Sequence, residues 1–202
     1  MRGVKANALL RALTCATAVG SIAFAAVLAT GGPAMGASCP PPPDSVFPFK
    51  PWADSNAYVL TTGGSFEAGG ADWSVSGGAA LVSDNAPNPL DPTSHVNSLS
   101  LPPGSSALSP CVTAPKILGI VRFFSRVAGT AGTRLAVEVI VKGKTYQAGT
   151  VTPGTEWAPS PMLQSDAPAY KGAVGYQVRV TAVGTGGPVS IDDIYFDPYV
   201  SR

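Results

Sequence analysis

Apolar and polar residues alternate with a period of two in several short segments of the second half of the chain. In residues 135–142, one face carries Leu135, Val137, Val139 and Val141. Residues 120–127 and 176–182 show the same alternation. This spacing is typical of strands with one buried face. The three segments therefore predict the central strands of a β-sheet protein.

Shorter runs rich in Val, Ile and Thr lie between Gly, Pro, Asn and Asp, and predict further strands at residues 79–82, 98–101, 144–150 and 189–196. Gly143 suits a tight turn between two of the strands. No long amphipathic helix is present. The 23 glycines and 20 prolines favour turns over helices. We therefore expect an all-β fold, an antiparallel β-sandwich of seven to nine strands.

The amino-terminal segment has the pattern of a secretory signal. Three basic residues precede an uncharged run, residues 12–30, which is followed by Gly31 and Gly32. Small residues around Ala37 predict cleavage there, although the uncharged run is also long enough for an uncleaved membrane anchor. Weakly hydrophobic Ala, Thr, Gly and Ser favour the cleaved form. We expect residues 1–37 to be a signal peptide and the protein to be secreted, outside the cell or on its envelope.

The mature chain then divides into a Pro-rich lead-in, residues 38–57, and a β-sandwich domain, residues 58–202. Aromatic residues in the lead-in predict that it packs on the domain. Cleavage removes Cys15 and leaves Cys39 and Cys111. An even pair of cysteines in an oxidising compartment predicts one disulfide, and two free thiols are the alternative.

Charge and residue usage exclude several classes of function. The formal net charge is +1, and removing residues 1–37 leaves ten Lys and Arg against twelve Asp and Glu. Such a balance predicts no binding to nucleic acid and no membrane association after cleavage. A single histidine cannot supply a common zinc site, and no nucleophile motif is present. The three mature glutamates, Glu67, Glu138 and Glu156, form no recognisable catalytic pattern, so we expect no enzyme activity.

Two segments carry a family resemblance. Residues 63–69 read GGSFEAG and are followed by DWSVSGG at residues 72–78, and the chain closes with IDDIYF at residues 191–196. This order resembles that of galactose-binding-like jelly rolls, including carbohydrate-binding modules of families 4 and 9. The longer pattern, residues 52–199, is also similar to that of uncharacterised secreted actinobacterial proteins. The resemblance implies a jelly-roll sandwich and an extracellular glycan ligand.

The same resemblance implies a structural calcium ion held by Glu67 and Asp192, with Asp193 as a further candidate. The alternation adds support, because it places Asp192 on the face of Ile194 and Phe196, where a charge needs a cation or several hydrogen-bond donors. Carboxylate oxygens suit calcium. The alternative is that Glu67 and Asp192 accept backbone N–H groups at strand ends.

A polar row on the predicted strands is the candidate glycan-binding face, provided that these strands are neighbours. Arg, Glu and Gln can pair with sugar hydroxyls while an aromatic ring, from Phe124 or Tyr146, stacks on the sugar. An ordinary solvated sheet face is the alternative. The candidate binding residues are Arg122, Phe124, Arg126, Glu138, Gln177 and Arg179.

Three further residues have less specific roles. Trp73 and Trp157 are interpreted as core anchors more readily than as sugar platforms. His95 is interpreted as a surface loop residue. The sequence thus predicts a secreted, non-catalytic module that binds a glycan or cell-envelope polysaccharide. A structural or protein-interaction sandwich is the alternative, which a predicted face without an exposed ring would favour.

Overall fold

The computed structural model describes residues 39–87, 90, 95–114, 119–168, 170 and 172–197. The predicted signal peptide lies outside these residues. Within them, no helix has the length and apolar character that crossing a membrane requires. Among the residues that the structure describes, the helical content is one 3-10 turn, Lys50–Trp52.

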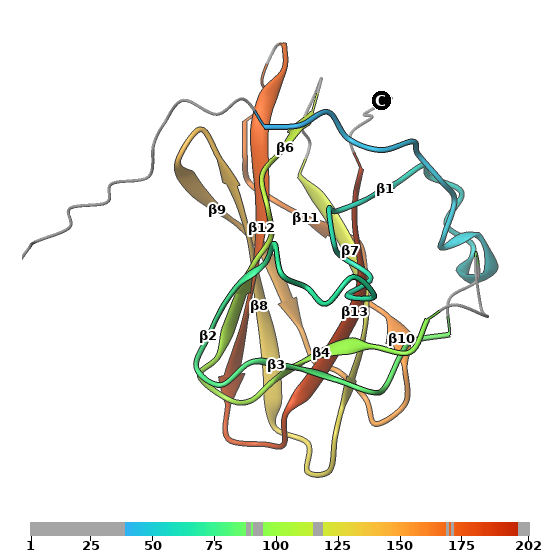
Figure 1. The fold of residues 1–202 in the computed structure, drawn as a ribbon, viewed down its shortest axis with the longest axis vertical. Coiled ribbons are helices and arrows are strands. Elements are labelled where there is room, and N and C mark those ends of the chain that lie inside the picture. Colours follow the sequence, from blue (N-terminus) through green and yellow to red (C-terminus); the bar gives the residue numbers. More distant parts are fainter. Residues whose placement is uncertain are drawn as a thin grey trace, which may run out of the picture. The chain divides into compact units, whose positions relative to one another are not determined.

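The described strands form two antiparallel sheets, which Figure 1 shows as separate layers. The seven-stranded sheet has the order β10 (Ala158–Pro159), β7 (Ile120–Val127), β13 (Val189–Asp197), β4 (Ser98–Leu101) and β3 (Ala80–Val82), with β1 (Val59–Leu60) on β13 and β11 (Leu163–Gln164) on β7. The six-stranded sheet has the order β2 (Ser74–Ser76), β5 (Ser106–Leu108), β12 (Val174–Gly184), β8 (Thr133–Val141) and β9 (Lys144–Val151), with β6 (Val112–Ala114) on β12.

The predicted all-β class and antiparallel β-sandwich are confirmed. The segments with clear alternation are strands, and Lys142 and Gly143 both take positive φ in the turn between β8 and β9, at 50° and 72°. Thirteen strands occur in the described part of the chain, more than the seven to nine expected. The extra ones span two or three residues, which is too short to show a period.

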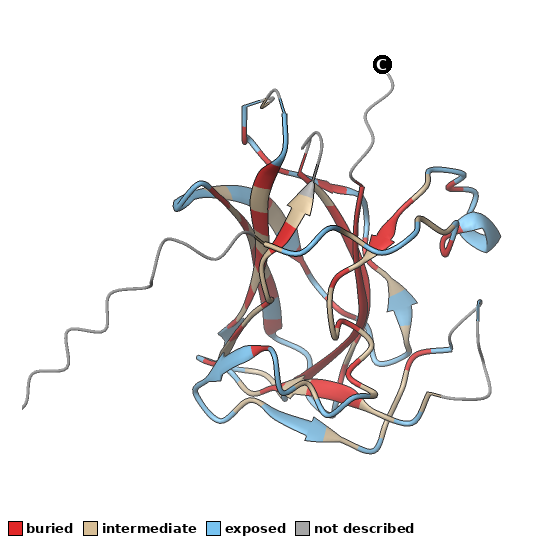
Figure 2. Cartoon of the chain, turned by 45° about the horizontal axis from the view of Figure 1, so that its top comes forward, coloured by how far each residue is buried: buried red, intermediate tan, exposed pale blue. Residues whose placement is uncertain are grey.

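The main core lies between the two sheets and is built from the alternating positions. Along β12 and β8, buried and partly exposed residues alternate almost without interruption. Valines and aromatic residues of both sheets meet there, including Tyr176 of β12 and Phe196 of β13, whose ring centroids lie 4.9 Å apart. Buried positions follow the central strands of both sheets in Figure 2.

A second, smaller core covers the outer face of the seven-stranded sheet. It consists of Phe49, Tyr58, Ala86, Phe124 and Tyr195, all buried. The lead-in supplies Phe49, and a β-bridge between Val46 and Tyr58 holds the lead-in in place. Because one face of β13 lies in each core, every residue of this strand is buried. The lead-in therefore packs on the domain.

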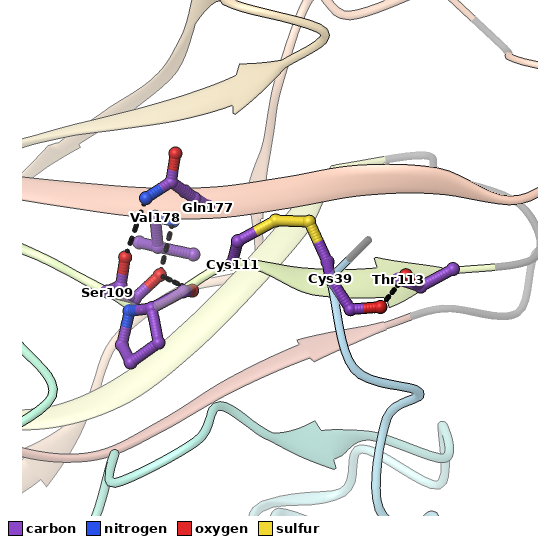
Figure 3. Close-up of a disulfide and its surroundings, with 7 residues drawn as sticks. Cys39, Ser109, Cys111, Thr113, Gln177 and Val178 are labelled. Carbon is purple, nitrogen blue, oxygen red and sulfur yellow. Dashed lines mark hydrogen bonds between the residues drawn. A yellow bond between two sulfur atoms is a disulfide. The ribbon is translucent and has the colours of Figure 1, made fainter. Parts of the chain in front are cut away.

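A disulfide joins Cys39 at the start of the lead-in to Cys111 beside β6, with 5.3 Å between their Cα atoms. Figure 3 shows the bond next to β12, where Gln177 Nε2 donates to the carbonyl of Ser109. The Thr113 hydroxyl donates to the carbonyl of Cys39. The predicted pairing is thus present in the structure and ties one end of the lead-in to the six-stranded sheet.

Candidate functional site

The strand β13 contains a bulge at the residues that the calcium prediction named. Asp192 pairs with Phe124 of β7 and Tyr195 pairs with Arg122, so Asp193 and Ile194 together lie opposite Phe123. Asp193 takes a left-handed backbone conformation, with φ of 48°. An extra residue in one strand is the defining feature of a β-bulge, which re-aims the side chains around it.

The bulge changes the face on which Asp192 lies. Its partner Phe124 belongs to the outer core, and Asp192 Oδ2 accepts the backbone N–H of Ala86, also in that core. Ile194 belongs to the main core instead. The sequence expectation that Asp192 shares a face with Ile194 and Phe196 is therefore wrong, because it assumed unbroken alternation.

Asp193 is fully buried, and neither of its carboxylate oxygens has a hydrogen-bond partner. Burial and the charge of Glu67 raise its pKa to about 6, against the lowering effect of His95. Burial and the charge of Asp193 raise the pKa of Asp192 to about 8, although two backbone N–H groups lower it. Two buried carboxylates are costly when charged unless a cation or donors compensate them.

Glu67 holds the chain segment that follows His95. Its Oε1 accepts the backbone N–H groups of Val96 and Asn97 at 2.9 and 2.8 Å, and its Oε2 accepts Asn97 Nδ2 at 3.2 Å. The expected alternative, acceptance of backbone N–H groups, thus occurs at Glu67 and also at Asp192. Glu67 Oε1 uses both of its lone pairs for these N–H groups, whereas Glu67 Oε2 and the two Asp192 oxygens accept one bond each and keep a lone pair for a cation.

His95 lies in a loop, as expected, but beside the buried carboxylates and not on the surface, so that part of its sequence interpretation is wrong. Its Nδ1 is 3.8 Å from Asp193 Oδ1, and its side chain is 11% exposed. Together with Asp192, these residues place potential ligand atoms within 4.8 Å of one another. The sequence carried no signal for this proximity, because 98 residues separate His95 from Asp193.

The residue set fits a divalent cation. Asp193 offers two unpartnered oxygens and Asp192 adds a hard carboxylate donor, the type that calcium prefers. Glu67 is not part of the group whose ligand atoms lie within 4.8 Å. The charge of Glu67 acts on both aspartates. We call Glu67, Asp192 and Asp193 the carboxylate cluster. A cation there would compensate a charge that no described donor satisfies at Asp193.

An open pocket of about 550 Å³ adjoins the carboxylate cluster through His95. Lead-in residues and the loop after β1 form its walls, which combine apolar side chains with hydroxyl and carboxylate groups. We call it the lead-in pocket. Its lining is Pro41, Pro42, Pro43, Asp44, Val46, Leu60, Thr61, Thr62, Gly63, Ser65, Leu90, His95 and Tyr195.

The predicted glycan-binding face is divided between opposite sides of the sandwich. Arg122, Phe124 and Arg126 lie on β7 of the seven-stranded sheet. Glu138 lies on β8, and Gln177 and Arg179 on β12, of the other sheet. Strands β8 and β12 are neighbours, but β7 belongs to the other sheet, so the condition for a single face is not met. Sequence alternation shows which way a side chain points but not which strands pair.

The three β7 residues are engaged in packing. Arg122 pairs with Asp54 of the lead-in and is 7% exposed. Phe124 is fully buried, with Phe49 at 5.5 Å and Trp52 at 5.3 Å between ring centroids. Its ring is covered and offers no surface for a sugar to stack on. Arg126 binds Asp84 and lies over the Trp157 ring.

The remaining three residues form a polar network on the outer face of the six-stranded sheet. Arg179 Nη1 donates to Glu138 Oε2 at 3.1 Å, and Gln147 Nε2 donates to Glu138 Oε1 at 2.8 Å. No outward position of β12, β8 or β9 carries an aromatic residue. Tyr146 lies in the inward row, opposite Val139, and its hydroxyl bonds that of Tyr170.

Trp73 and Trp157 pack against the cores, as the sequence interpretation of them as core anchors expects. Trp73 is 5% exposed and packs on Phe66, and its Nε1 donates to the carbonyl of Thr62. Trp157 is half-buried against the second core. Trp52, in the lead-in, is 41% exposed. A stacking platform on Trp73 is therefore absent.

Comparison with solved structures finds similar sandwiches at low sequence identity. A TmCBM61 structure in complex with β-1,4-galactotriose has a TM-score of 0.44 and 20% identity, covering 67% of this chain and 95% of that one. A family 6 carbohydrate-binding module has a TM-score of 0.40 and 10% identity, covering 70% and 93%. The arabinose-bound MgGH51 α-L-arabinofuranosidase has a TM-score of 0.43 and 21% identity, covering 68% and 26%. No family profile and no curated protein matches the chain.

Proposed function

We propose that this protein is a secreted, non-catalytic binding module and that its ligand is a neutral glycan bound in the lead-in pocket. The pocket carries the proposal. Its volume of about 550 Å³ lies in the usual range for small-molecule sites. Prolines and Leu60 offer apolar surface to the C–H face of a sugar ring, while Thr62, Ser65 and Asp44 offer hydrogen-bonding groups to its hydroxyls.

The carboxylates around the pocket support a non-catalytic role. Among its described lining residues, Asp44 is the only carboxylate. Glycosidases generally use two carboxyl groups that flank the scissile bond. Asp192 and Asp193 are fully buried and belong to the carboxylate cluster instead. The disulfide between Cys39 and Cys111 supports secretion, because such bonds persist in oxidising compartments.

A structural calcium ion at Glu67, Asp192 and Asp193 is part of the proposal. The buried, unpartnered carboxylate of Asp193 supports it. Calcium should raise the melting temperature of chelator-treated protein, because a ligand that binds only the folded state stabilises it. Asp193→Asn should abolish this rise and still fit the backbone, since Asn tolerates positive φ. An unchanged melting temperature in wild-type protein would exclude the calcium site.

A protein-interaction module is the second candidate. The outer face of the six-stranded sheet has no outward aromatic residue on β12, β8 or β9, which removes a sugar platform there. On the lead-in, Phe47 and Trp52 are 53% and 41% exposed. Exposed aromatic residues are enriched at protein interfaces. This candidate gains support if the folded protein binds no glycan.

The deciding experiment is a binding screen of the oxidised mature protein against glycans and cell-envelope polysaccharides, with calcium and with chelator. Saturable binding should weaken about 10-fold or more in Asp44→Asn, because a hydrogen bond to a charged group contributes about 1.5–3 kcal/mol. Arg179→Ala is the matched control on the sheet face and should bind as wild type. Loss of binding in Arg179→Ala but not Asp44→Asn would place the site on the sheet. No binding by folded protein would reject the glycan proposal.

A further inference from the structure

His95 is shared by the lead-in pocket and the buried carboxylates. Its side chain lines the pocket, and its Nδ1 lies 3.8 Å from Asp193 Oδ1. Because the His95 side chain is only 11% exposed, its ring is enclosed between the lead-in pocket and the Asp193 carboxylate. A change in the position or charge of Asp193 therefore acts directly on His95, a residue of the pocket wall.

A second connection runs through the loop after β1. Thr61, which lines the pocket, donates through both its backbone N–H and its hydroxyl to the carbonyl of Ile194. The N–H of Ile194 donates to the carbonyl of Gly64 in the same loop. Ile194 directly follows Asp193 in the bulge. The pocket wall is thus hydrogen-bonded to the residue next to the unpartnered carboxylate.

A third connection runs through Glu67, a member of the carboxylate cluster. Glu67 accepts the backbone N–H groups of Val96 and Asn97, the two residues that follow His95. The position of the Glu67 carboxylate therefore sets the position of the segment that carries His95. All three connections lead from the carboxylate cluster to the same pocket.

We infer that a divalent cation at the carboxylate cluster and a glycan in the lead-in pocket bind cooperatively, with His95 as the positioning residue between them. This inference rests on the proposed function. Without a cation, the buried Asp193 carboxylate has no hydrogen-bond donor and lies close to a second buried carboxyl group, that of Asp192. A cation fixes the carboxylates, the residue 95–97 segment and the loop after β1 in one arrangement. The glycan then binds a pre-ordered pocket and loses less free energy to ordering.

The cooperativity has a measurable size and is reciprocal. Couplings between two sites commonly change affinity about 5- to 150-fold, and each ligand must change the affinity for the other by the same factor. Calcium should therefore tighten glycan binding, and saturating glycan should tighten calcium binding equally. Isothermal titration calorimetry in both orders measures the two factors, with the glycan that the binding screen identifies.

The single histidine of the chain supplies a direct probe of the linking residue. In mature protein without a polyhistidine tag, all imidazole C–H proton signals belong to His95. Addition of calcium to chelator-treated protein should shift these signals, and addition of Mn²⁺ should broaden them because the ion is paramagnetic and close. In Asp193→Asn, neither effect should occur, and glycan affinity should equal that of cation-free wild type.

His95→Gln separates coupling from binding. This variant should keep most of the calcium-dependent rise in melting temperature, while the coupling factor falls toward 1. Asp44→Asn is the matched pocket control, because it should weaken glycan binding and leave the coupling factor unchanged. A structural role alone for His95 would lower the melting temperature of the variant without changing the coupling factor.

The outcomes distinguish this inference from the proposed function. Equal glycan affinities with calcium and with chelator overturn the cooperativity and leave glycan binding standing. Calcium stabilisation without any change in the His95 signals also overturns it, because the cation would then lie away from the linking residue. Absence of glycan binding under both conditions overturns the proposed function and the cooperativity together.

Discussion

Arg122 in the middle of the seven-stranded sheet forms a buried ion pair with Asp54 of the lead-in, 68 residues earlier in the chain. Both side chains are 8% exposed. Arg122 also donates through Nε and Nη2 to the carbonyl of Ser160, and Tyr58 donates its hydroxyl to Asp54 Oδ2. The guanidinium lies 4.2 Å from the centre of the Phe49 ring. The pair therefore fastens the lead-in onto the sandwich.

Removing one partner of this pair should destabilise the protein strongly. Arg122→Met keeps much of the aliphatic stem but leaves Asp54 buried without its cation, a change that costs about 3–5 kcal/mol. Urea denaturation of the oxidised protein measures the free energy of unfolding. Arg126→Met is the control, because Arg126 and Asp84 are 34% and 23% exposed and such pairs contribute about 0–1 kcal/mol. Equal losses in both variants would contradict the structure.

The stability that Asp54 contributes should disappear in acid. Burial raises the pKa of this carboxyl, but hydrogen bonds from Tyr58, Asn56 and Arg122 and the charge of Arg122 hold it below its ordinary value of 3.8. On acidification, the unfolded chain therefore takes up this proton before the folded chain does, and stability falls with pH.

Comparison with Asp54→Asn isolates this effect at a fixed calcium concentration. Wild-type protein should be more stable than the variant at neutral pH, and the difference should shrink as the pH falls below about 4. Urea denaturation across this pH range measures the difference. A stability difference that widens in acid would contradict a lowered pKa of Asp54 in the folded protein.

Phe124 should contribute to stability and not to ligand binding. Phe124→Ala removes a fully buried ring from the second core and should cost about 3–5 kcal/mol. Trp52→Ala should cost less, because 41% of that side chain is already exposed. Denaturation and the glycan screen on the same proteins test both statements. A stable Phe124→Ala variant that loses glycan binding would contradict this prediction and indicate that the Phe124 ring binds sugar.

Replacement of Gly175 should be more costly while the disulfide is present. A Cβ at this position would lie 2.7 Å from Cys39 Sγ and 3.1 Å from Cys111 Sγ. Gly175→Ala should therefore cost about 1–3 kcal/mol through overpacking. In a Cys39→Ser, Cys111→Ser background the cost should be smaller, since oxygen is smaller than sulfur.

A double-mutant cycle on unfolding free energies tests this dependence. Loss of the disulfide alone should cost about 4 kcal/mol, the chain-entropy value for cysteines separated by 72 residues. Additive effects of the glycine and cysteine changes would show that the alanine methyl group does not meet the sulfur atoms.

Sequence alone determined the fold class and the longer strands. Strands β8 and β12 repeat the alternation over nine and eleven residues, so a local pattern carries enough information there, whereas β7 is buried on both faces. The cysteine count likewise predicted the disulfide, because only one pairing remains if the expected signal cleavage removes Cys15. These features depend on neighbours in the chain or on simple counting.

Tertiary structure decided which side chains meet. Strand pairing places Arg122 and Glu138 in different sheets, although both point outward from their strands. The lead-in then covers one outer face, which turns Arg122 and Phe124 from candidate ligands into buried anchors. The bulge at Asp193 breaks the alternation and brings a buried carboxylate to His95. Such contacts join residues about 70 to 100 positions apart, and no local periodicity encodes a distance across a sheet.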